Sequence, residues 1–345
     1  MEDTNGHKEK NLTSKFSLES KEKLLTSKEI RKEAGKESNI EENQETEEIE
    51  EEIEEEIEEE IEEEIEEEIE EEIEEEIEEE MEVESAASEF LVTAEKRWEE
   101  IDLLINQIEE NKDNEELYNV LCRSSVVLMV AHLEGYIKEA ASALIKDLNY
   151  NVKFADIPSQ IKLMHVSSFL DIENLSKPSK AEHKKIQNLM KEFDKFGVEI
   201  DPASFLFEQN KNPSPSIIEK VMNNFGVKDF FATIYDSRLD DVFTNDPTVT
   251  NMLLEEVRSH TKEALKIYPY NIDLIKFNIN GNKAKIKREQ SMWITFLDEL
   301  MQKRHQIAHG SIFSNTISDK LLIDFRDKIK ILQYGIALVL FKVNP

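Results

Sequence analysis

Four long stretches of this sequence repeat apolar residues at spacings of three and four, and this periodicity is the strongest constraint on the fold. They cover residues 88–111, 115–148, 289–309 and 318–343. Such spacing places the apolar side chains on one face of an α-helix, and that face must be buried against another element. The whole chain has only 8 Gly and 8 Pro, which leave these stretches almost uninterrupted. The pattern predicts an all-α helical bundle.

The segment between the two pairs of helices, residues 149–288, is less regular. It holds most of the prolines, and we predict short helices at residues 216–225 and 251–267. Residues 277–286 alternate in polarity around Asn280-Gly281, a dipeptide that favours two-residue turns, so a small hairpin is predicted there. We expect this inserted, mostly helical middle segment to cap the bundle.

Charge divides the chain before the bundle begins. Residues 1–40 carry 9 basic and 8 acidic side chains, whereas residues 41–84 carry 31 acidic side chains and no basic one. The formal charge of −35 therefore comes mainly from this low-complexity acidic tail, and residues 85–345 keep only −5, from 33 basic and 38 acidic side chains. The sequence predicts a polar disordered arm over 1–40, an acidic spacer over 41–84 and a helical domain over 85–345.

The acidic spacer repeats Ile-Glu-Glu-Glu, with an isoleucine at every fourth position from Ile49 to Ile77. Four residues advance an α-helix by about 400°, so the isoleucine row drifts around the axis and forms no coiled-coil seam. Like charges three and four residues apart also destabilise a helix. We expect a disordered or fluctuating helical spacer; the alternative function is an acidic tract that binds a partner or mimics a nucleic acid.

Cysteine content and hydropathy indicate the compartment. The single cysteine, Cys122, excludes an intrachain disulfide and fits a reducing cytosol. The longest apolar runs, residues 126–131 and 334–341, are far shorter than the roughly 20 residues of a bilayer span. Residues 1–10 lack the apolar core of a secretory signal. We therefore expect a cytoplasmic protein with no membrane partner.

Two charged residues fall on apolar stripes of the predicted helices. Glu134 interrupts the stripe of the second long helix, and Arg304 interrupts that of the third. An unpaired buried charge is costly, so each side chain needs an opposite charge or a polar cleft. The alternatives are a structural ion pair between Glu134 and Arg304, or one polar pocket that both share with His309.

The end of the third helix carries a recognisable motif. It reads Arg-His-Gln-Ile-Ala-His-Gly at residues 304–310, with Phe-Leu-Asp-Glu-Leu upstream at 296–300. This ending resembles the Arg-x(4–6)-His motif of HEPN domains, especially the RiboL-PSP-HEPN group. The apolar run into Leu-Glu-x-Tyr at 130–138 and the Pro-Ser-Pro-Ser segment with its short helix at 213–227 resemble the same group. The resemblance covers residues 85–345 and implies a HEPN-type helical bundle.

The resemblance also implies a function. Many HEPN domains are metal-independent endoribonucleases that act as homodimers in toxin-antitoxin, abortive-infection or other antiviral systems. Other members are catalytically inactive and serve as helical interaction modules, and this alternative stays open. On the first reading the partners are an RNA substrate, a second copy of the chain and an antitoxin or other protein, and no cofactor is expected.

Individual roles follow from the resemblance and from side-chain chemistry. His309 carries over as the acid/base group, since imidazole titrates near neutral pH. Arg304 carries over as the phosphate clamp, because its planar fork matches two phosphate oxygens. We expect His305 to orient substrate or transfer the second proton, and Glu134 to hold Arg304 or a histidine. Lys303 and Arg288 are the predicted substrate-binding residues.

Helix geometry leaves two questions about this site. Residues five apart on an ideal helix point about 140° apart, so Arg304 and His309 converge only if the last turn loosens. His305 and His309 are four apart and share a face, which is the spacing of zinc-binding histidines, but the HExxH glutamate and an obvious third ligand are missing. No metal site is predicted. Other histidines are expected on the surface: His7, His165, His183 and His260.

Overall fold

The computed structural model describes residues 84–170, 178–206, 212–280, 291–310 and 317–342. These residues belong to one compact unit that spans Val83–Pro345. Every regular element within the described ranges is an α-helix or a 3-10 helix, which confirms the predicted all-α fold. The arm over residues 1–40 and nearly all of the acidic spacer lie outside the described residues, so both stay predictions.

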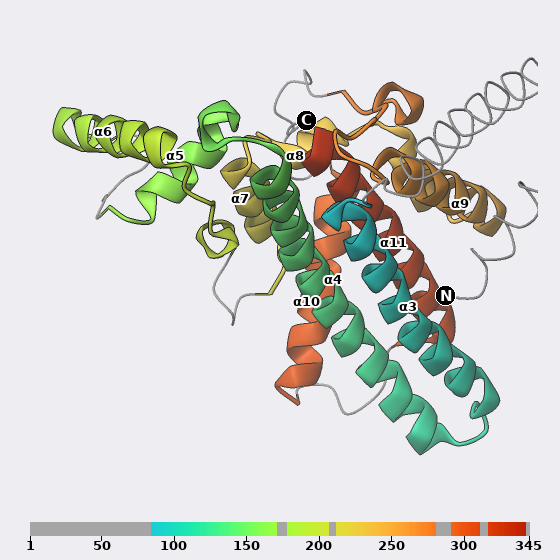
Figure 1. Ribbon diagram of the computed structural model, residues 1–345. Helices are drawn as coiled ribbons and strands as arrows, with labels where there is room; N and C mark the ends of the chain where they lie inside the picture. The colour runs from blue at the N-terminus through green and yellow to red at the C-terminus, as the bar shows by residue number, and fades with distance from the viewer. Residues whose placement is uncertain (1–83, 171–177, 207–211, 281–290, 311–316, 343–345) are drawn as a thin grey trace, which may run out of the picture. The chain divides into compact units, whose positions relative to one another are not determined.

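Four long helices form the bundle, close to the predicted boundaries. They are α3 (Ala86–Glu110), α4 (Glu115–Asn151), α10 (Met292–Ala308) and α11 (Asp319–Lys342). Helix α4 packs against the other three, and Figure 1 shows it running between α10 on one side and α3 and α11 on the other. Its buried side chains lie around most of its circumference, as predicted for the central helix.

Among the described helices, α4 is the one that is long and apolar enough to cross a membrane by length and composition. The sequence analysis predicted no such helix. Half of the apolar window of α4 is buried inside the bundle. Because α4 has helical neighbours on several sides, this burial accounts for its apolar composition.

A buried polar cluster joins three of the long helices. The indole N–H of Trp98 on α3 donates to the side-chain oxygen of Gln333 on α11 at 2.7 Å. The hydroxyl of Tyr136 on α4 donates to the backbone carbonyl of Gln333, also at 2.7 Å. All three side chains are buried. Because a buried polar group without a partner costs about 1–3 kcal/mol, these two bonds favour one register of the three helices.

Asp147, near the C-terminal end of α4, holds the beginning of α3. Its buried carboxylate accepts hydrogen bonds from the backbone N–H groups of Ala86 at 2.7 Å and Ala87 at 3.0 Å. It also accepts from the hydroxyl of Tyr270 at 2.6 Å. Burial, together with this carboxylate, raises the pKa of Tyr270, so the hydroxyl stays a donor. The first-turn N–H groups of α3 and the buried carboxylate thereby satisfy one another.

Short helices fill the insertion between α4 and α10. The α-helices are α5 (Ser159–Ser167), α6 (Lys180–Phe196), α7 (Pro215–Asn224), α8 (Phe230–Thr233) and α9 (Pro247–Ala264). The 3-10 helices are η1 (Phe154–Asp156), η2 (Pro202–Phe205), η3 (Arg238–Thr244) and η4 (Ile275–Phe277). Helices α7 and α9 match the two predicted short helices. Helices α9 and η3 pack on α11, whereas α5 and α6 pack on each other.

The sequence analysis missed α6, although its start and stop signals are local. Ser179 and Glu182 form a capping box at its beginning, and Gly197 follows its end with a φ of 63°. Apolar residues recur at helical spacing between these signals, from Ile186 to Phe193. A capping box before such a run and a glycine after it are sufficient grounds to predict a helix.

The hairpin predicted over residues 277–286 is not seen in the part of that segment that the structure describes. Phe277 ends η4, and Asn278 follows in the left-handed region with a φ of 54°. The N–H of Asn278 donates to the carbonyl of Ile275 at 2.9 Å, which closes a 3-10 turn where a strand was expected. The remainder, residues 281–286, lies outside the described residues.

Two of the four histidines predicted at the surface have buried imidazole atoms. His165 is 1% exposed among aromatic rings of the insertion, and the Nε2 atoms of His165 and His260 have no hydrogen-bond partner. His132 on α4 is also buried and packs edge-on against Trp98. Burial lowers the pKa of all three imidazoles, because the charged form is desolvated.

These buried histidines predict a loss of stability in acid. The unfolded chain binds protons on them near pH 6.5, whereas the folded chain resists protonation, so stability is full above that pH and falls as the pH drops below it. We expect a lower urea midpoint at pH 5.5 than at pH 7.5, followed by circular dichroism. His165→Gln should reduce this pH dependence, and His183→Gln, which changes an exposed histidine, should leave it unchanged. Identical pH dependence in wild type and His165→Gln would contradict this explanation.

Candidate active site

The last two turns of α10 carry the residues singled out by the sequence. The beginning of this helix is anchored, because Ser291 caps it and Trp293, Phe296, Leu297 and Leu300 are buried in the core. Beyond Leu300 the helix emerges from the core, and no residue after it in α10 is fully buried. Figure 1 shows this end of α10 beside α4.

His305 and His309 form an exposed pair of imidazoles. Their ring centroids lie 4.2 Å apart with an angle of 49° between the planes. Both residues are exposed, so both rings are open to solvent. The spacing of four residues predicted that they share a face. Two imidazoles in contact, each with one ring nitrogen that donates and one that accepts a hydrogen bond when neutral, are suited to proton transfer.

The last turn of α10 stays helical up to His309. The backbone N–H of His309 donates to the carbonyl of His305 at 3.0 Å, the bond of a regular α-turn. His309 is the C-cap, and Gly310 follows with a φ of 65°. The loosening that would bring Arg304 and His309 onto one face is therefore not observed, and the backbone directs the two side chains to different sides of the helix.

Arg304 lies at the end of the core-facing stripe of α10 and is half-buried. Its guanidinium makes no hydrogen bond or ion pair with any other residue that the structure describes. A partly desolvated guanidinium whose donors have no partner among the described residues is suited to bind an anion.

Glu134 has a different partner from the one predicted. Its carboxylate pairs with Lys138, one turn along α4, at 2.6 Å, and about a quarter of each side chain is exposed. The prediction of a structural ion pair between Glu134 and Arg304 is therefore wrong, because Lys138 on the same helix pairs with Glu134 instead. The role of Glu134 in positioning Arg304 or a histidine stays a prediction.

Lys303 and Arg288 were predicted to bind substrate, and of these two the structure describes Lys303. Lys303 lies next to Arg304 on α10, with its ammonium 3.7 Å from the carboxylate of Glu299. Arg288 lies outside the described residues. Within the described ranges there is no group of three His, Cys, Asp or Glu side chains that could hold a metal ion, so the His305–His309 pair has no third ligand there.

An apolar groove formed by α3, α4 and the last turn of α10 was not predicted. It measures about 510 Å³ and is lined by Leu104, Val120, Arg123, Ser124, Val127, Leu128, Ala131 and Ile307. Val120 is 49% exposed, and Leu103, next to the lining residue Leu104, is 62% exposed. The signal in the sequence was Arg123, a charged residue at the beginning of the apolar run of α4.

Comparison with known proteins adds one finding. Residues 93–245, less than half of the chain, match the model of a family described as RiboL-PSP-HEPN. No curated protein and no solved structure matches the chain. The matched range includes Glu134 and ends before α10, so Arg304, His305 and His309 lie outside it.

The exposure of the histidine pair is testable with diethyl pyrocarbonate. His305 and His309 should be modified as fast as the exposed His183, whereas the buried His132 and His165 should react at least about tenfold more slowly, because reagent access follows solvent exposure. Peptide mapping by mass spectrometry measures each rate. Equal rates for His309 and His165 would show that the α10 pair is covered in solution.

Proposed function

From the match of residues 93–245 to the RiboL-PSP-HEPN family model, a HEPN-type family, we propose that the protein is a metal-independent endoribonuclease. The observation that carries the proposal is the end of α10, where an arginine with no described partner adjoins two exposed imidazoles. These are the groups that RNA cleavage without a metal requires: a cation for the phosphate, a base and an acid.

The proposed reaction is an internal transfer at a phosphodiester. One imidazole takes the proton of a ribose 2′-OH, and the 2′-oxygen attacks the adjacent phosphorus. The bond from phosphorus to the 5′-oxygen breaks, and an imidazolium gives its proton to that leaving oxygen. The products are a 2′,3′-cyclic phosphate and a 5′-hydroxyl end. Arg304 supports the negative charge that develops on the non-bridging oxygens.

A single chain does not supply both proton-transfer groups in suitable positions. The attacking and leaving oxygens lie on opposite sides of the phosphorus, so the base and the acid must flank it. The rings of His305 and His309 are in contact with each other, 4.2 Å apart, and therefore stand on one side of any bound phosphodiester. We assign the second side to the partner's His309 in a homodimer.

The apolar groove supplies a surface for that dimer. Ile307, which lines it, is one turn from Arg304 on the same face of α10, so a second copy that covers the groove also approaches the arginine. The exposed Leu103 and Val120 would lose contact with water on association, at about 25 cal/mol for each Å² of apolar surface buried. Both copies would present the same face, as a two-fold interface requires.

The biological setting in this proposal is cytoplasmic. Cys122 is buried and is the single cysteine of the sequence, so the chain can form no intrachain disulfide, which suits a reducing compartment. By the family resemblance, the substrate is a cellular or invading RNA, and the role is that of a toxin or antiviral effector held in check by an antitoxin or another protein partner.

Cleavage assays on the full chain test the proposal. With EDTA present, Arg304→Ala and His309→Ala should each lower the rate of RNA cleavage at least about 100-fold, because each removes a group that acts in the transition state. Gln302→Ala, an exposed change on the same helix, should leave the rate unchanged. Gel analysis of labelled RNA measures the rates, and circular dichroism checks the helices.

The alternative is a catalytically inactive HEPN-type interaction module, and the same variants distinguish it. No cleavage of any RNA by wild type, together with a lowered melting temperature for Arg304→Ala, would favour the inactive module and refute the ribonuclease.

The proposed dimer makes a separate prediction. Val120→Glu should convert dimers to monomers and remove cleavage activity, because a carboxylate in the apolar groove is desolvated without a partner when a second copy covers it. Analytical ultracentrifugation measures the mass. Val92→Glu, at an exposed valine in the first half of α3, is the matched control and should change neither. A monomeric wild type with full activity would refute the dimer.

A further inference from the structure

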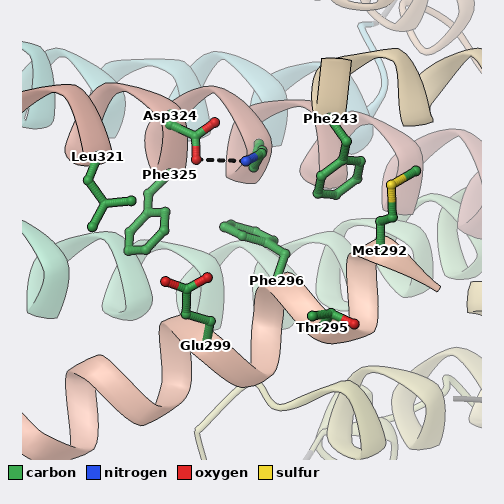
Figure 2. A pocket seen from close by; sticks show the side chains of 9 residues that line it. Phe243, Met292, Thr295, Phe296, Glu299, Leu321, Asp324 and Phe325 are labelled. Atoms are coloured by element: carbon green, nitrogen blue, oxygen red, sulfur yellow. Dashed lines mark hydrogen bonds and ion pairs between the residues drawn. The ribbon is translucent and has the colours of Figure 1, made fainter. Parts of the chain in front are cut away.

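A second cavity lies between α10 and α11, away from the apolar groove. It measures about 250 Å³, and Figure 2 shows Phe296 and Glu299 entering it from α10 while Leu321, Asp324 and Phe325 enter it from α11. Phe243 of η3 closes one end next to Met292, which is 45% exposed. This volume is just below the range of about 300–1,000 Å³ typical of drug-sized ligands, so the cavity suits a single small ring system.

Aromatic rings form one wall of this cavity. The ring of Phe243 lies 4.8 Å from that of Trp293, and the ring of Phe296 lies 5.7 Å from that of Phe325. The rings of Phe243 and Phe296 are 6.4 Å apart. A planar ligand can pack edge-on against such side chains.

A charged pair lies beside the rings. The ammonium of Lys328 is 2.6 Å from the carboxylate of Asp324, drawn as the dashed line in Figure 2. The same ammonium lies over the rings of Phe243 at 5.2 Å and Phe296 at 5.8 Å. The cavity therefore presents a hydrogen-bond donor and an acceptor side by side on an aromatic wall.

The charges and rings that line the cavity determine which class of ligand it can bind. A cation is disfavoured, because Lys328 already occupies the position over the rings. An anion is disfavoured by the carboxylates of Asp324 and Glu299 on facing walls. A neutral planar heterocycle fits, and guanine fits best: its O6 accepts from an ammonium, and its adjacent N1–H and N2–H₂ donate to a carboxylate.

The cavity also stands at a suitable distance from the proposed catalytic residues. Glu299 and Lys303 are one turn apart on the same face of α10, and their charged groups lie 3.7 Å apart. Arg304, five residues after Glu299, lies about 7.5 Å along the helix axis and about 140° around it. A strand that reaches both the cavity and Arg304 therefore crosses the helix past Lys303, and the base in the cavity belongs to a nucleotide further along the strand than the phosphate at Arg304.

We propose that the cavity between α10 and α11 binds an unpaired guanine base of the RNA substrate, packed against the edges of Phe243 and Phe296 and hydrogen-bonded to the Asp324–Lys328 pair. The inference rests on the proposed ribonuclease function. On this inference, the guanine bound in the cavity determines where along a single-stranded RNA the chain cleaves.

Binding to 2′-O-methyl RNA tests this inference without cleavage, because the blocked 2′-oxygen cannot attack. Fluorescein-labelled UUGUU and UUUUU are titrated with the full chain and followed by anisotropy. We expect UUGUU to bind about tenfold more tightly, since a good bidentate contact to a base discriminates by at least about this factor. Asp324→Asn should remove the preference, whereas Asp298→Asn, the same change on a side chain that does not line the cavity, should retain it.

A second variant tests the same site independently, in case Asp324→Asn does not fold. Phe243→Leu removes one ring and leaves the ion pair, and it should also lower the affinity for UUGUU while circular dichroism stays unchanged. Of the two tryptophans, Trp293 contacts Phe243 and Trp98 lies on α3, so the tryptophan fluorescence of the chain should change when UUGUU binds and stay constant with UUUUU.

The outcomes separate this inference from the ribonuclease itself. Equal affinity for UUGUU and UUUUU, or a preference that survives both Asp324→Asn and Phe243→Leu, would overturn the guanine site. Guanosine monophosphate that competes as tightly as UUGUU would identify a free nucleotide as the ligand and overturn the assignment to RNA. A guanine preference in a chain that never cleaves unmodified RNA would support the site and refute the ribonuclease.

Discussion

The packing of α4 against α3, α10 and α11 is the constraint on which the rest of this structure depends. Apolar contacts alone leave the register between helices adjustable by a turn, since one leucine-like side chain replaces another at little cost. The two hydrogen bonds to Gln333 remove that freedom, because a shift of either helix would leave the buried Trp98 or Tyr136 without a partner. Asp147 fixes the other end by holding the first turn of α3.

The first half of α10 is buried in the core and the second half is not, and this difference positions the candidate site. Four large side chains immobilise the first half of the helix, so the second half projects as a rigid continuation. Arg304, His305 and His309 are therefore held by regular helical backbone, which reduces the entropy lost on binding a ligand. The same rigidity keeps the rings of His305 and His309 on one side of any bound phosphodiester, and this is the physical reason why the proposed chemistry needs a second copy of the chain.

The fold was largely predictable, and the exceptions have separate causes. The four long helices followed from apolar periodicity, which reports burial of one face directly. Helix α6 was missed although Ser179, Glu182 and Gly197 gave it clear boundaries. The beginning of the predicted hairpin is a 3-10 turn, because an alternating pattern does not exclude one in so short a segment.

The sequence by itself determined the helical class, the separation of the acidic tail and the identity of the residues at the end of α10, because composition and periodicity are local properties. Only the tertiary structure decided that Glu134 pairs with Lys138, that His165 is buried, and that Phe243, Phe296 and Lys328 meet at one cavity. Partner choice and burial depend on which helices lie side by side, and residues 85 positions apart along the chain, such as Phe243 and Lys328, carry no local signal of their proximity.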